Sequence, residues 1–508
     1  MKAPSAPGHD GLEEKMRQQP NLVYVFADQL RFQSMGYAGD EKAVTPHINR
    51  FATEGVNFAN AVASSPVCTA YRASLLTGRY TTSHGMVINE LRMNPHQRCF
   101  GHVLTDAGYR TGYIGKWHLY ANELGHHDDP QNSFVPRGPD RLGFDGEWKA
   151  YNFHHDNYGA YYHTETTEKI FYGEGVYEPD AQTDFAIDFL RRAATEQEPF
   201  AIFLSWGPPH DPWGPDNVPT RFWQRHAATP FPDPPNYRAE DDVPYADAWA
   251  MLSAEERAQL ESWRRGYYAQ VTSIDENFGR LLTALDECGA SHETLVVFTS
   301  DHGEMFGAQG RRAKNIFYEE ACHVPLLMRA PGRLPAGLVS DACLGTVDLM
   351  PTLLALLGLP CPEDVEGMDL SHCALGTPGP EPQAAFLQIC GATASWEDGH
   401  EWRALRDKRH TYAVYRVDGN ELLFDNQADP FQRRNLANEP SYTATRDRFR
   451  SALAAKMAGL NDRFECCTWY RDHWTDGHRS IIRSATNDFT QRRPQGGIIE
   501  EENEEETP

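Results

Sequence analysis

Residues able to do acid–base or metal chemistry stand at the ends of four apolar runs of strand length. The runs are "LVYVFAD", "TGYIGKWH", "FAIFLSWGPPH" and "TLVVFTSDH", and the polar residues are Asp28, Gln29, Lys116, His118, His210, Asp301 and His302. Ligands of open parallel sheets bind where loops leave the carboxyl ends of the strands. We therefore expect these side chains, spread over nearly 275 positions of the chain, to meet at one sheet edge.

Four of these residues form a set typical of a divalent-cation site. Asp28 and Asp301 supply carboxylates, Gln29 an amide oxygen and His302 a ring nitrogen. Each aspartate alone would be better explained as a cap for the helix that follows its strand. Because both strand ends pair an aspartate with a second type of ligand, we favour the cation site.

A cysteine in "SSPVCTAYRASLLTGRY", Ser64 to Tyr80, is the candidate nucleophile. Cys68 precedes a segment with a helical pattern, whose N-terminus attracts anions, and Arg72 adds a planar cation. A cysteine nucleophile normally needs a neighbouring histidine base. The alternative is a buried, inert thiol, which we accept for Cys99, Cys288, Cys343 and most of the other cysteines.

The elements that must position these residues are typical of an α/β fold, a large and mainly parallel sheet flanked by helices. Amphipathic segments predict helices over residues 45–55, 100–108, 180–194, 267–289 and 346–359. A proline-rich stretch, residues 375–383, precedes a smaller C-terminal unit. There we expect an antiparallel sheet from strands over 384–389, 401–407, 410–417 and 421–425, with one face covered by a helix over 441–464.

These patterns divide the chain into four regions. We expect a flexible N-terminus over 1–20, the α/β domain over 21–378, the C-terminal α+β subdomain over 379–474 and an extended acidic tail over 475–508. The tail contains "EEENEEE", whose glutamates stay solvated.

Composition excludes several classes of function. The chain has 47 basic and 72 acidic residues, a formal charge of −25, which argues against nucleic acid and anionic membranes as partners. It contains no apolar run of about 18 residues and no apparent signal peptide. We therefore expect a cytoplasmic protein, or a periplasmic or secreted one if a leader was removed. Ten scattered cysteines without a C-x-x-C pair disfavour a thiolate zinc site and indicate mostly free thiols.

The stretch around Cys68 resembles the signature of the type I, formylglycine-dependent sulfatases of the alkaline phosphatase superfamily. "CTAYRASLLTGRY" is similar to C-x-P/A-x-R followed by x-S-L-L-T-G-R/Q-Y. The family's other blocks are matched in order by "TGYIGKWHL", "SWGPPHDPW", "TSDHGEMFGAQG", "KNIFYEEACHVPLLMRAPG" and "TVDLMPTLLALLG". The similarity runs from about Asn21 to "ELLFDNQADPFQRRNLA" and covers most of the chain. "FADQLRFQSMGYAG", Tyr71 and "WKAYNFHHDNYGAYYH" look closest to the branch acting on sulfated polysaccharides, including sulfated galactans.

The resemblance implies a sulfuric ester hydrolase acting on a sulfated carbohydrate. It implies that a formylglycine-generating or equivalent maturation enzyme oxidises Cys68 to formylglycine. It also implies one divalent metal, Ca²⁺ before Mn²⁺ or Mg²⁺, held by Asp28, Gln29, Asp301, His302 and the modified Cys68. Arg72 and Lys116 would steady the aldehyde hydrate, and His118 would help to break the hemiacetal. His210 and Lys314 would grip the sulfate, and one of them would protonate the leaving oxygen.

Three positions depart from the family's usual pattern. Gln29 replaces a second acid, which lowers the negative charge of the site by one, and His302 stands where many members have asparagine. Ala70 replaces the more usual proline of the signature, which puts the efficiency of modification in doubt.

The residues leave other functions open. The same scaffold with formylglycine serves phosphonate monoester and phosphodiester hydrolases, although "GKWHL" favours a sulfatase, and a catalytically inactive carbohydrate-binding relative is a third possibility. The aromatic stretch from Trp148 to Tyr172 is either a specificity loop that stacks on sugars or a small core under a long loop. His84 is a further candidate for the pocket.

Overall fold

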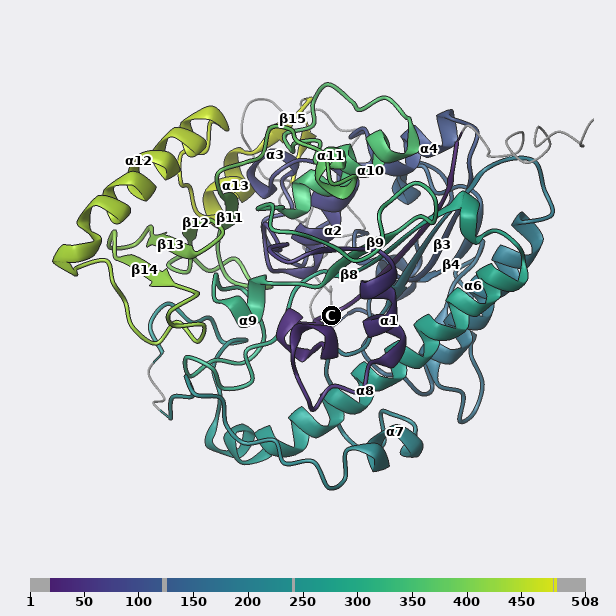
Figure 1. The fold of residues 1–508 in the computed structure, drawn as a ribbon, viewed down its shortest axis with the longest axis horizontal. Coiled ribbons are helices and arrows are strands. Elements are labelled where there is room, and N and C mark those ends of the chain that lie inside the picture. The colour runs from purple at the N-terminus through teal and green to yellow at the C-terminus, as the bar shows by residue number, and fades with distance from the viewer. Residues whose placement is uncertain (1–18, 121–125, 240–242, 478, 482–508) are drawn as a thin grey trace, which may run out of the picture.

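An eight-stranded mixed sheet forms the centre of the protein, here described from a computed structural model (Figure 1). The structure describes residues 19–120, 126–239, 243–477 and 479–481, so most of the predicted N-terminal region and the glutamate-rich part of the tail lie outside it. In sheet order the strands are β10 (Leu338–Ser340), β2 (Val56–Phe58), β9 (Leu326–Arg329), β8 (Thr294–Ser300), β1 (Asn21–Ala27), β7 (Phe200–Trp206), β3 (Arg110–Lys116) and β4 (Glu147–Tyr151). Only β9 runs antiparallel to its neighbours, which confirms the predicted mainly parallel sheet.

The four apolar runs of the sequence are the four adjacent strands β8, β1, β7 and β3. All four run parallel, and Ala27 of β1 lies opposite Trp206 of β7 and Ser300 of β8. These three strands therefore end level with one another, and the loops that leave them start at one edge. Buried on both faces, such strands are apolar throughout rather than alternating.

Helices cover both faces of this sheet (Figure 1). Val23 and Val25 of β1 pack in one core with α1 (Pro46–Glu54), α6 (Glu178–Ala193) and α8 (Ala254–Glu287), and α7 (Thr220–Arg225) packs on α8. Tyr24 and Phe26 face the opposite core, with α2 (Cys68–Thr77), α4 (Phe100–Asp106) and α10 (Leu349–Leu357). Shorter elements connect these layers: α3 (Thr81–His84), α5 (Pro130–Ser133), β5 (Tyr161–Tyr162), β6 (Ile170–Phe171), α9 (Glu319–Cys322) and α11 (Ser371–Ala374).

Helix α8 is longer than the sequence pattern predicted. It begins at Ala254 rather than near residue 267, because Ser253 and Glu256 form a capping box at its N-terminus. Gly266, inside the helix, allows close packing, since a Cβ there would lie 2.0 Å from the carbonyl oxygen of Trp213.

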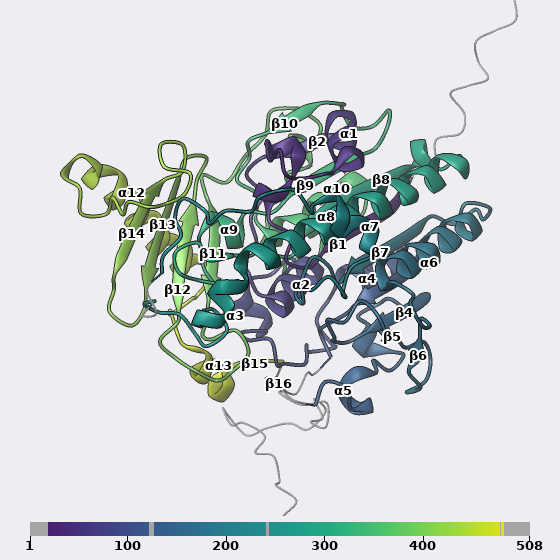
Figure 2. The ribbon, with the colours of Figure 1, turned by 90° about the horizontal axis from the view of Figure 1, so that it is seen from below.

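The C-terminal region forms a second, antiparallel sheet, as predicted (Figure 2). Its strands, in spatial and chain order, are β11 (Ala385–Ile389), β12 (Trp402–Arg406), β13 (His410–Tyr415) and β14 (Glu421–Asp425). Helix α12 (Thr443–Gly459) packs on one face through Phe449 and Leu453. The other face packs against loops of the large domain, as described below.

Part of the predicted extended tail is folded. A short helix, α13 (Cys467–His473), precedes a hairpin of β15 (Thr475–Asp476) and β16 (Arg479–Ser480). Trp474 packs against Gly85, and Asn94 donates a hydrogen bond of 2.7 Å to Asp476. These contacts with the large domain order the chain beyond the expected boundary at residue 474.

All ten cysteines are described and free, most of them buried, as the sequence indicated. Within the described part of the chain, no helix combines the length and the apolar character that crossing a membrane requires.

Candidate active site

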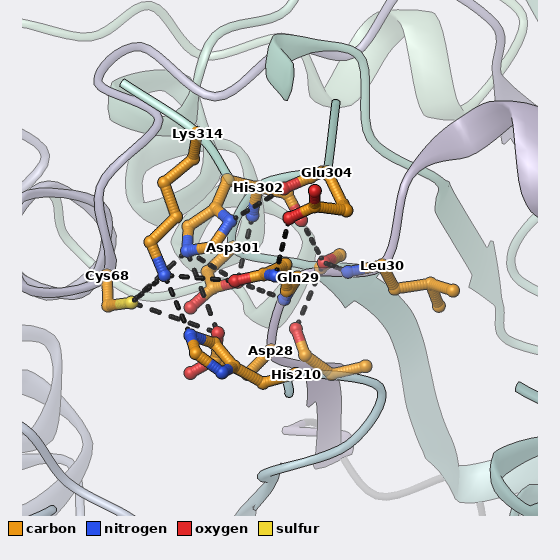
Figure 3. A network of polar contacts seen from close by, with 12 residues as sticks. Asp28, Gln29, Leu30, Cys68, His210, Asp301, His302, Glu304 and Lys314 are labelled. Atoms are coloured by element: carbon orange, nitrogen blue, oxygen red, sulfur yellow. Dashed lines mark hydrogen bonds and ion pairs between the residues drawn. The ribbon is translucent and has the colours of Figure 1, made fainter. Parts of the chain in front are cut away.

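The carboxyl ends of the central strands bring the predicted site residues together (Figure 3). Every one of them is at least nine-tenths buried. They follow or end four separate strands: Asp28 and Gln29 after β1, Lys116 and His118 at and after β3, His210 after β7, and Asp301 and His302 after β8. The sheet topology thus explains how residues distant in sequence share one site.

Two of these residues have a backbone conformation that side chains rarely adopt. The φ angles of Gln29 and His118 are 69° and 56°. The backbone N–H of Gln29 donates to Asp301 Oδ1 at 2.9 Å, and the backbone N–H of His118 donates to the carbonyl of Asn152 at 2.9 Å. Such strain persists where surrounding contacts hold it, typically at functional sites.

Cys68 lies at the N-terminus of the buried helix α2 and points at the strand ends. Its Sγ lies 3.2 Å from His302 Nε2 and 3.8 Å from Asp28 Oδ1. Lys314, from the loop after β8, donates to the same sulfur at 3.2 Å. The candidate nucleophile is therefore placed between a candidate metal-binding group and a cation.

The donor atoms of Asp28, Cys68, Asp301 and His302 all lie within 4.8 Å of one another. His302 Nδ1 faces the carbonyl of Gly303 at 3.1 Å, which assigns the proton to Nδ1 and leaves the Nε2 lone pair free to bind. Nε2 lies 3.6 Å from both Asp28 Oδ1 and Asp301 Oδ1. Two carboxylates and a correctly turned imidazole fit a divalent cation.

A buried glutamate that the sequence analysis missed fixes the orientation of Gln29. Glu304 Oε2 accepts a hydrogen bond from Gln29 Nε2 at 2.7 Å, and its Oε1 accepts from the amides of Phe306 and Ala313. The Gln29 amide oxygen consequently faces the site and accepts from Lys314 Nζ at 3.0 Å. Glu304 thus orients the side chain of Gln29, the residue that replaces the family's second acid.

Two cations lie against the outer oxygens of the paired carboxylates. Arg72 donates to Asp28 Oδ2 at 3.3 Å and to Asp301 Oδ2 at 3.4 Å, and Lys116 Nζ lies 2.6 Å from Asp28 Oδ2. The other side of the Arg72 guanidinium donates to Ser205 Oγ at 2.8 Å. Each carboxylate keeps its Oδ1 turned towards His302.

These charges shift the protonation of the buried acids. Burial by itself would raise the pKa of the Cys68 thiol, but the ammonium groups of Lys314 and Lys116 hold it well below its usual value. Burial would likewise raise the pKa of Asp28, and Lys116, His210 and Lys314 hold it low. The pKa of Asp301 is raised by its burial and by the neighbouring Asp28. The site therefore favours a negative charge at position 68.

A cavity of about 180 Å³ opens onto Cys68, with His210 and Lys314 in its wall. Lys314 Nζ lies 2.9 Å from His210 Nε2, and His210 Nδ1 lies 2.6 Å from a carboxylate oxygen of Asp211. Burial and Lys314 oppose a charged imidazole, but Asp211 and Asp28 raise the pKa of His210 to about 9. The His210 ring is thus in its protonated, positively charged form at neutral pH.

His118 and His155 lie on the side of the site formed by β3 and β4. Burial lowers the pKa of His118 to about 3 although its ring hydrogen-bonds with Cys68, so the ring is neutral and can accept a proton. His155 Nε2 lies 3.4 Å from Lys116 Nζ, and its ring lies against that of His210 with centroids 3.8 Å apart. Burial and these two cations lower the pKa of His155 well below its usual value.

Three residues of the site escaped the sequence analysis: Asp211, His155 and Glu304. Local signals existed for each, because Asp211 adjoins His210, His155 lies in the aromatic stretch and Glu304 lies three residues after Asp301. Their roles depend on which neighbour each side chain meets, and spacing does not give that.

The stretch from Trp148 to Tyr172 contributes both to core packing and to the wall of the cavity, and its role as a specificity loop stays a prediction. Trp148 and Tyr161 are buried in packing, whereas Phe153 and His155 line the cavity. His84 was wrongly taken as a pocket candidate: its Nε2 lies 3.0 Å from Ser74 Oγ behind α2, and burial lowers its pKa to about 3.

Comparisons with known proteins agree with the resemblance found in the sequence. The sequence model of the sulfatase family matches residues 20–359, and the model described as N-sulphoglucosamine sulphohydrolase, C-terminal, matches residues 307–459. An ulvan-active sulfatase of Formosa agariphila is 35% identical over 459 residues, which cover 89% of this chain and 84% of the relative.

Two solved structures have the same fold as this chain. The crystal structure of a candidate sulfatase, yidJ, from Bacteroides fragilis has a TM-score of 0.77 at 30% identity and covers 89% of this chain and 99% of the other. A phosphonate monoester hydrolase of Silicibacter pomeroyi has a TM-score of 0.65 at 22% identity, with 88% and 96% covered, and shares the fold.

Proposed function

Because the chain belongs to the sulfatase family and is a sulfuric ester hydrolase, we propose that it removes sulfate from a sulfated carbohydrate with an aldehyde made from Cys68. The observation that carries this proposal is the position of Cys68, whose Sγ lies 3.2 Å from both Lys314 Nζ and His302 Nε2 beside an open cavity. The carbohydrate substrate class is supported by the ulvan-active relative and by the aromatic and polar walls of the cavity.

The proposed nucleophile is formylglycine, formed at Cys68 by a maturation enzyme. Hydration of the aldehyde gives a carbon with two hydroxyl groups. One hydroxyl attacks sulfur, and the bond between sulfur and the ester oxygen breaks to release the alcohol. The second hydroxyl then loses its proton, the carbon–oxygen bond to sulfate breaks, and the aldehyde returns as sulfate leaves. A serine adduct has no second hydroxyl and lacks this route.

The neighbouring residues supply charge and protons for these steps. Arg72 and Lys116 place fixed positive charge beside the hydrate, and Lys314 does the same for the sulfate oxygens. His210 protonates the leaving oxygen, since its pKa of about 9 keeps it protonated at neutral pH yet able to release the proton. Neutral His118, beside position 68, accepts the proton of the second hydroxyl.

A divalent cation held by Asp28, Gln29, Asp301 and His302 would, when bound, polarise the oxygens of the sulfate and of the hydrate. Calcium is our proposal, because carboxylate and amide oxygens dominate these donors. The nitrogen of His302 keeps manganese and magnesium as alternatives.

The alternative function is hydrolysis of phosphonate monoesters or phosphodiesters. The similarity to the phosphonate monoester hydrolase, at 22% identity, concerns the fold alone. Lys116 bonds to Asp28 and His118 to Cys68, and the presence of this Lys/His pair in the site favours the sulfatase over that branch.

The test joins one mass measurement to one comparison of rates. In protein from its native host, or made together with a formylglycine-generating enzyme, the peptide containing Cys68 should have the mass of the aldehyde form. That protein should cleave an aryl sulfate and release sulfate from ulvan oligosaccharides with a higher kcat/KM than it shows on an aryl phosphonate. The Cys68→Ala variant should be inactive on all three. An unmodified cysteine in active protein, or a higher phosphonate efficiency, overturns the proposal.

A further inference from the structure

One aromatic side chain of the cavity is exposed without an aromatic partner. Trp249 lines the cavity with Cys68 and is 40% exposed. The other large aromatic residues of the lining are packed: Trp213 lies 4.8 Å from the ring of Phe306, and Phe153 lies 4.6 Å from that of His118. Among the described residues, no aromatic ring stacks on the indole of Trp249. The fold therefore leaves a large apolar ring facing solvent at the cavity mouth. Packing in a hydrophobic core does not explain why a tryptophan stands at this position.

The backbone that carries this ring is held firmly. The carbonyl of Trp249 accepts from Arg312 Nε at 3.0 Å, and the carbonyl of Ala250 accepts from the Arg312 amide at 2.9 Å. Asp247, 3% exposed, accepts from the amides of Ala250 at 3.0 Å and Thr393 at 2.6 Å. Arg312 lies two residues before Lys314, so the backbone at residue 249 is fixed relative to the loop that carries Lys314. A flat ring on a fixed backbone loses little entropy when it binds a ligand.

The rest of the mouth offers polar groups. Asn89, Glu90 and Thr393 line the same cavity, and each is less than a tenth exposed. A pyranose ring has one face of C–H groups and an edge of hydroxyls. An indole beside hydrogen-bonding side chains fits both parts, because aromatic faces bind apolar surface and the polar groups satisfy the hydroxyls.

We propose that Trp249 is the stacking platform of a sugar-binding subsite at the mouth of the cavity. It binds the C–H face of a pyranose ring of the substrate while the sulfate ester lies at position 68. This inference rests on the proposed carbohydrate substrate and adds a residue that selects saccharides over small sulfate esters.

The experiment measures binding without turnover. In the Cys68→Ala background, calorimetry gives the Kd of sulfated ulvan oligosaccharides for otherwise unchanged protein and for Trp249→Ala and Trp249→Phe. We expect Trp249→Ala to weaken binding about tenfold, because it removes the whole flat apolar face, and Trp249→Phe less than about threefold, because it keeps a smaller one. Phe171→Ala is the matched control, because Phe171 is 61% exposed but lies outside the cavity, and it should bind as the background does.

The outcomes separate the two proposals. If the background binds the oligosaccharides and Trp249→Ala binds them equally well, the subsite is wrong and the carbohydrate substrate stands. If the background binds none while the Cys68-containing enzyme still cleaves an aryl sulfate, the carbohydrate substrate and the subsite both fail. Should Trp249→Ala not fold, Trp249→Leu keeps apolar volume without a flat ring, and equal affinity of the Leu and Phe variants overturns the inference.

Discussion

At the scale of single residues, the site works by placing charges where water cannot screen them. Asp28 and Asp301 are kept together by Arg72, and Lys314 lies between Gln29, Cys68 and His210. Each buried charge has a partner, as burial of an unpaired charge would be very unfavourable. The partners also set protonation: they lower the pKa of Cys68 and raise that of His210, as the proposed roles of an anionic group and a proton donor require.

Asp211 should control the alkaline limit of activity. Its carboxylate raises the pKa of His210 to about 9, and in the proposed mechanism the protonated imidazole is the acid, so the rate should fall as pH rises through that value. In Asp211→Asn the imidazolium loses its partner, its pKa falls, and the alkaline limb of the profile of kcat against pH moves to lower pH. Because Asp211 is 49% exposed and water screens its charge, we expect a shift of about one unit. The exposed Asp216→Asn in the same loop is the control, and an unmoved limb in Asp211→Asn would exclude His210 as the acid.

At the scale of elements, helix α8 connects the sheet to the loop that carries Lys314. Asp275 in the helix accepts from the amides of His47 and Ile48 and so caps α1, and Glu256 in its first turn forms an ion pair with Arg312. The Ser253 cap holds this first turn in place. The N-terminal end of α8 therefore supports the same loop that fixes Trp249 and Lys314.

Removing that cap should loosen the first turn of α8 locally. Ser253→Ala leaves the Glu256 amide without its acceptor, at a cost of about 1 kcal/mol. Hydrogen exchange measured by mass spectrometry should therefore be about fivefold faster over the first turn, at residues 254–258, and unchanged in β1. Gln259→Ala, at an exposed position of the same helix, should leave this exchange as it is. Equal exchange in wild type and Ser253→Ala would show that the cap contributes nothing.

At the scale of the whole molecule, the C-terminal sheet forms part of the support of the active site. Leu387 and Trp402 pack in one core with Val67, which precedes the nucleophile, and with Ile316, which follows the Lys314 loop. Trp402 Nε1 donates to the carbonyl of Asn315 at 3.3 Å. The smaller sheet thus holds the two loops that bring Cys68 and Lys314 together.

A buried ion pair joins the C-terminal sheet to helix α9 of the large domain and should be sensitive to loss of either partner. Arg406 of β12 donates to both carboxylate oxygens of Glu319, at 2.6 and 2.9 Å. Arg406→Met leaves that carboxylate buried with His323 and Asn426 but without its permanent cation, which should lower the free energy of unfolding by about 3 kcal/mol in urea titrations. Arg406→Met combined with Glu319→Met should recover most of the loss, and no recovery would contradict the pairing.

The pH dependence of this pair has a defined sign. Burial by itself would raise the pKa of Glu319, but Arg406 holds that pKa below its value in the unfolded chain. The stabilisation is therefore complete above the unfolded pKa of about 4 and is lost as pH falls further. The difference between wild type and Arg406→Met should accordingly shrink in acid.

The sequence by itself determined the strands that carry the site, a helix directly after the candidate nucleophile and the α/β architecture. Local patterns suffice there, because strand and helix formation depend on apolar periodicity and on caps within a few residues. The tertiary structure alone decided that Glu304 turns Gln29, that Asp211 charges His210 and that Trp249 stays uncovered at the cavity mouth. These facts depend on contacts between segments up to 275 residues apart and on burial that shifts each pKa, and only the packed chain brings such groups into range.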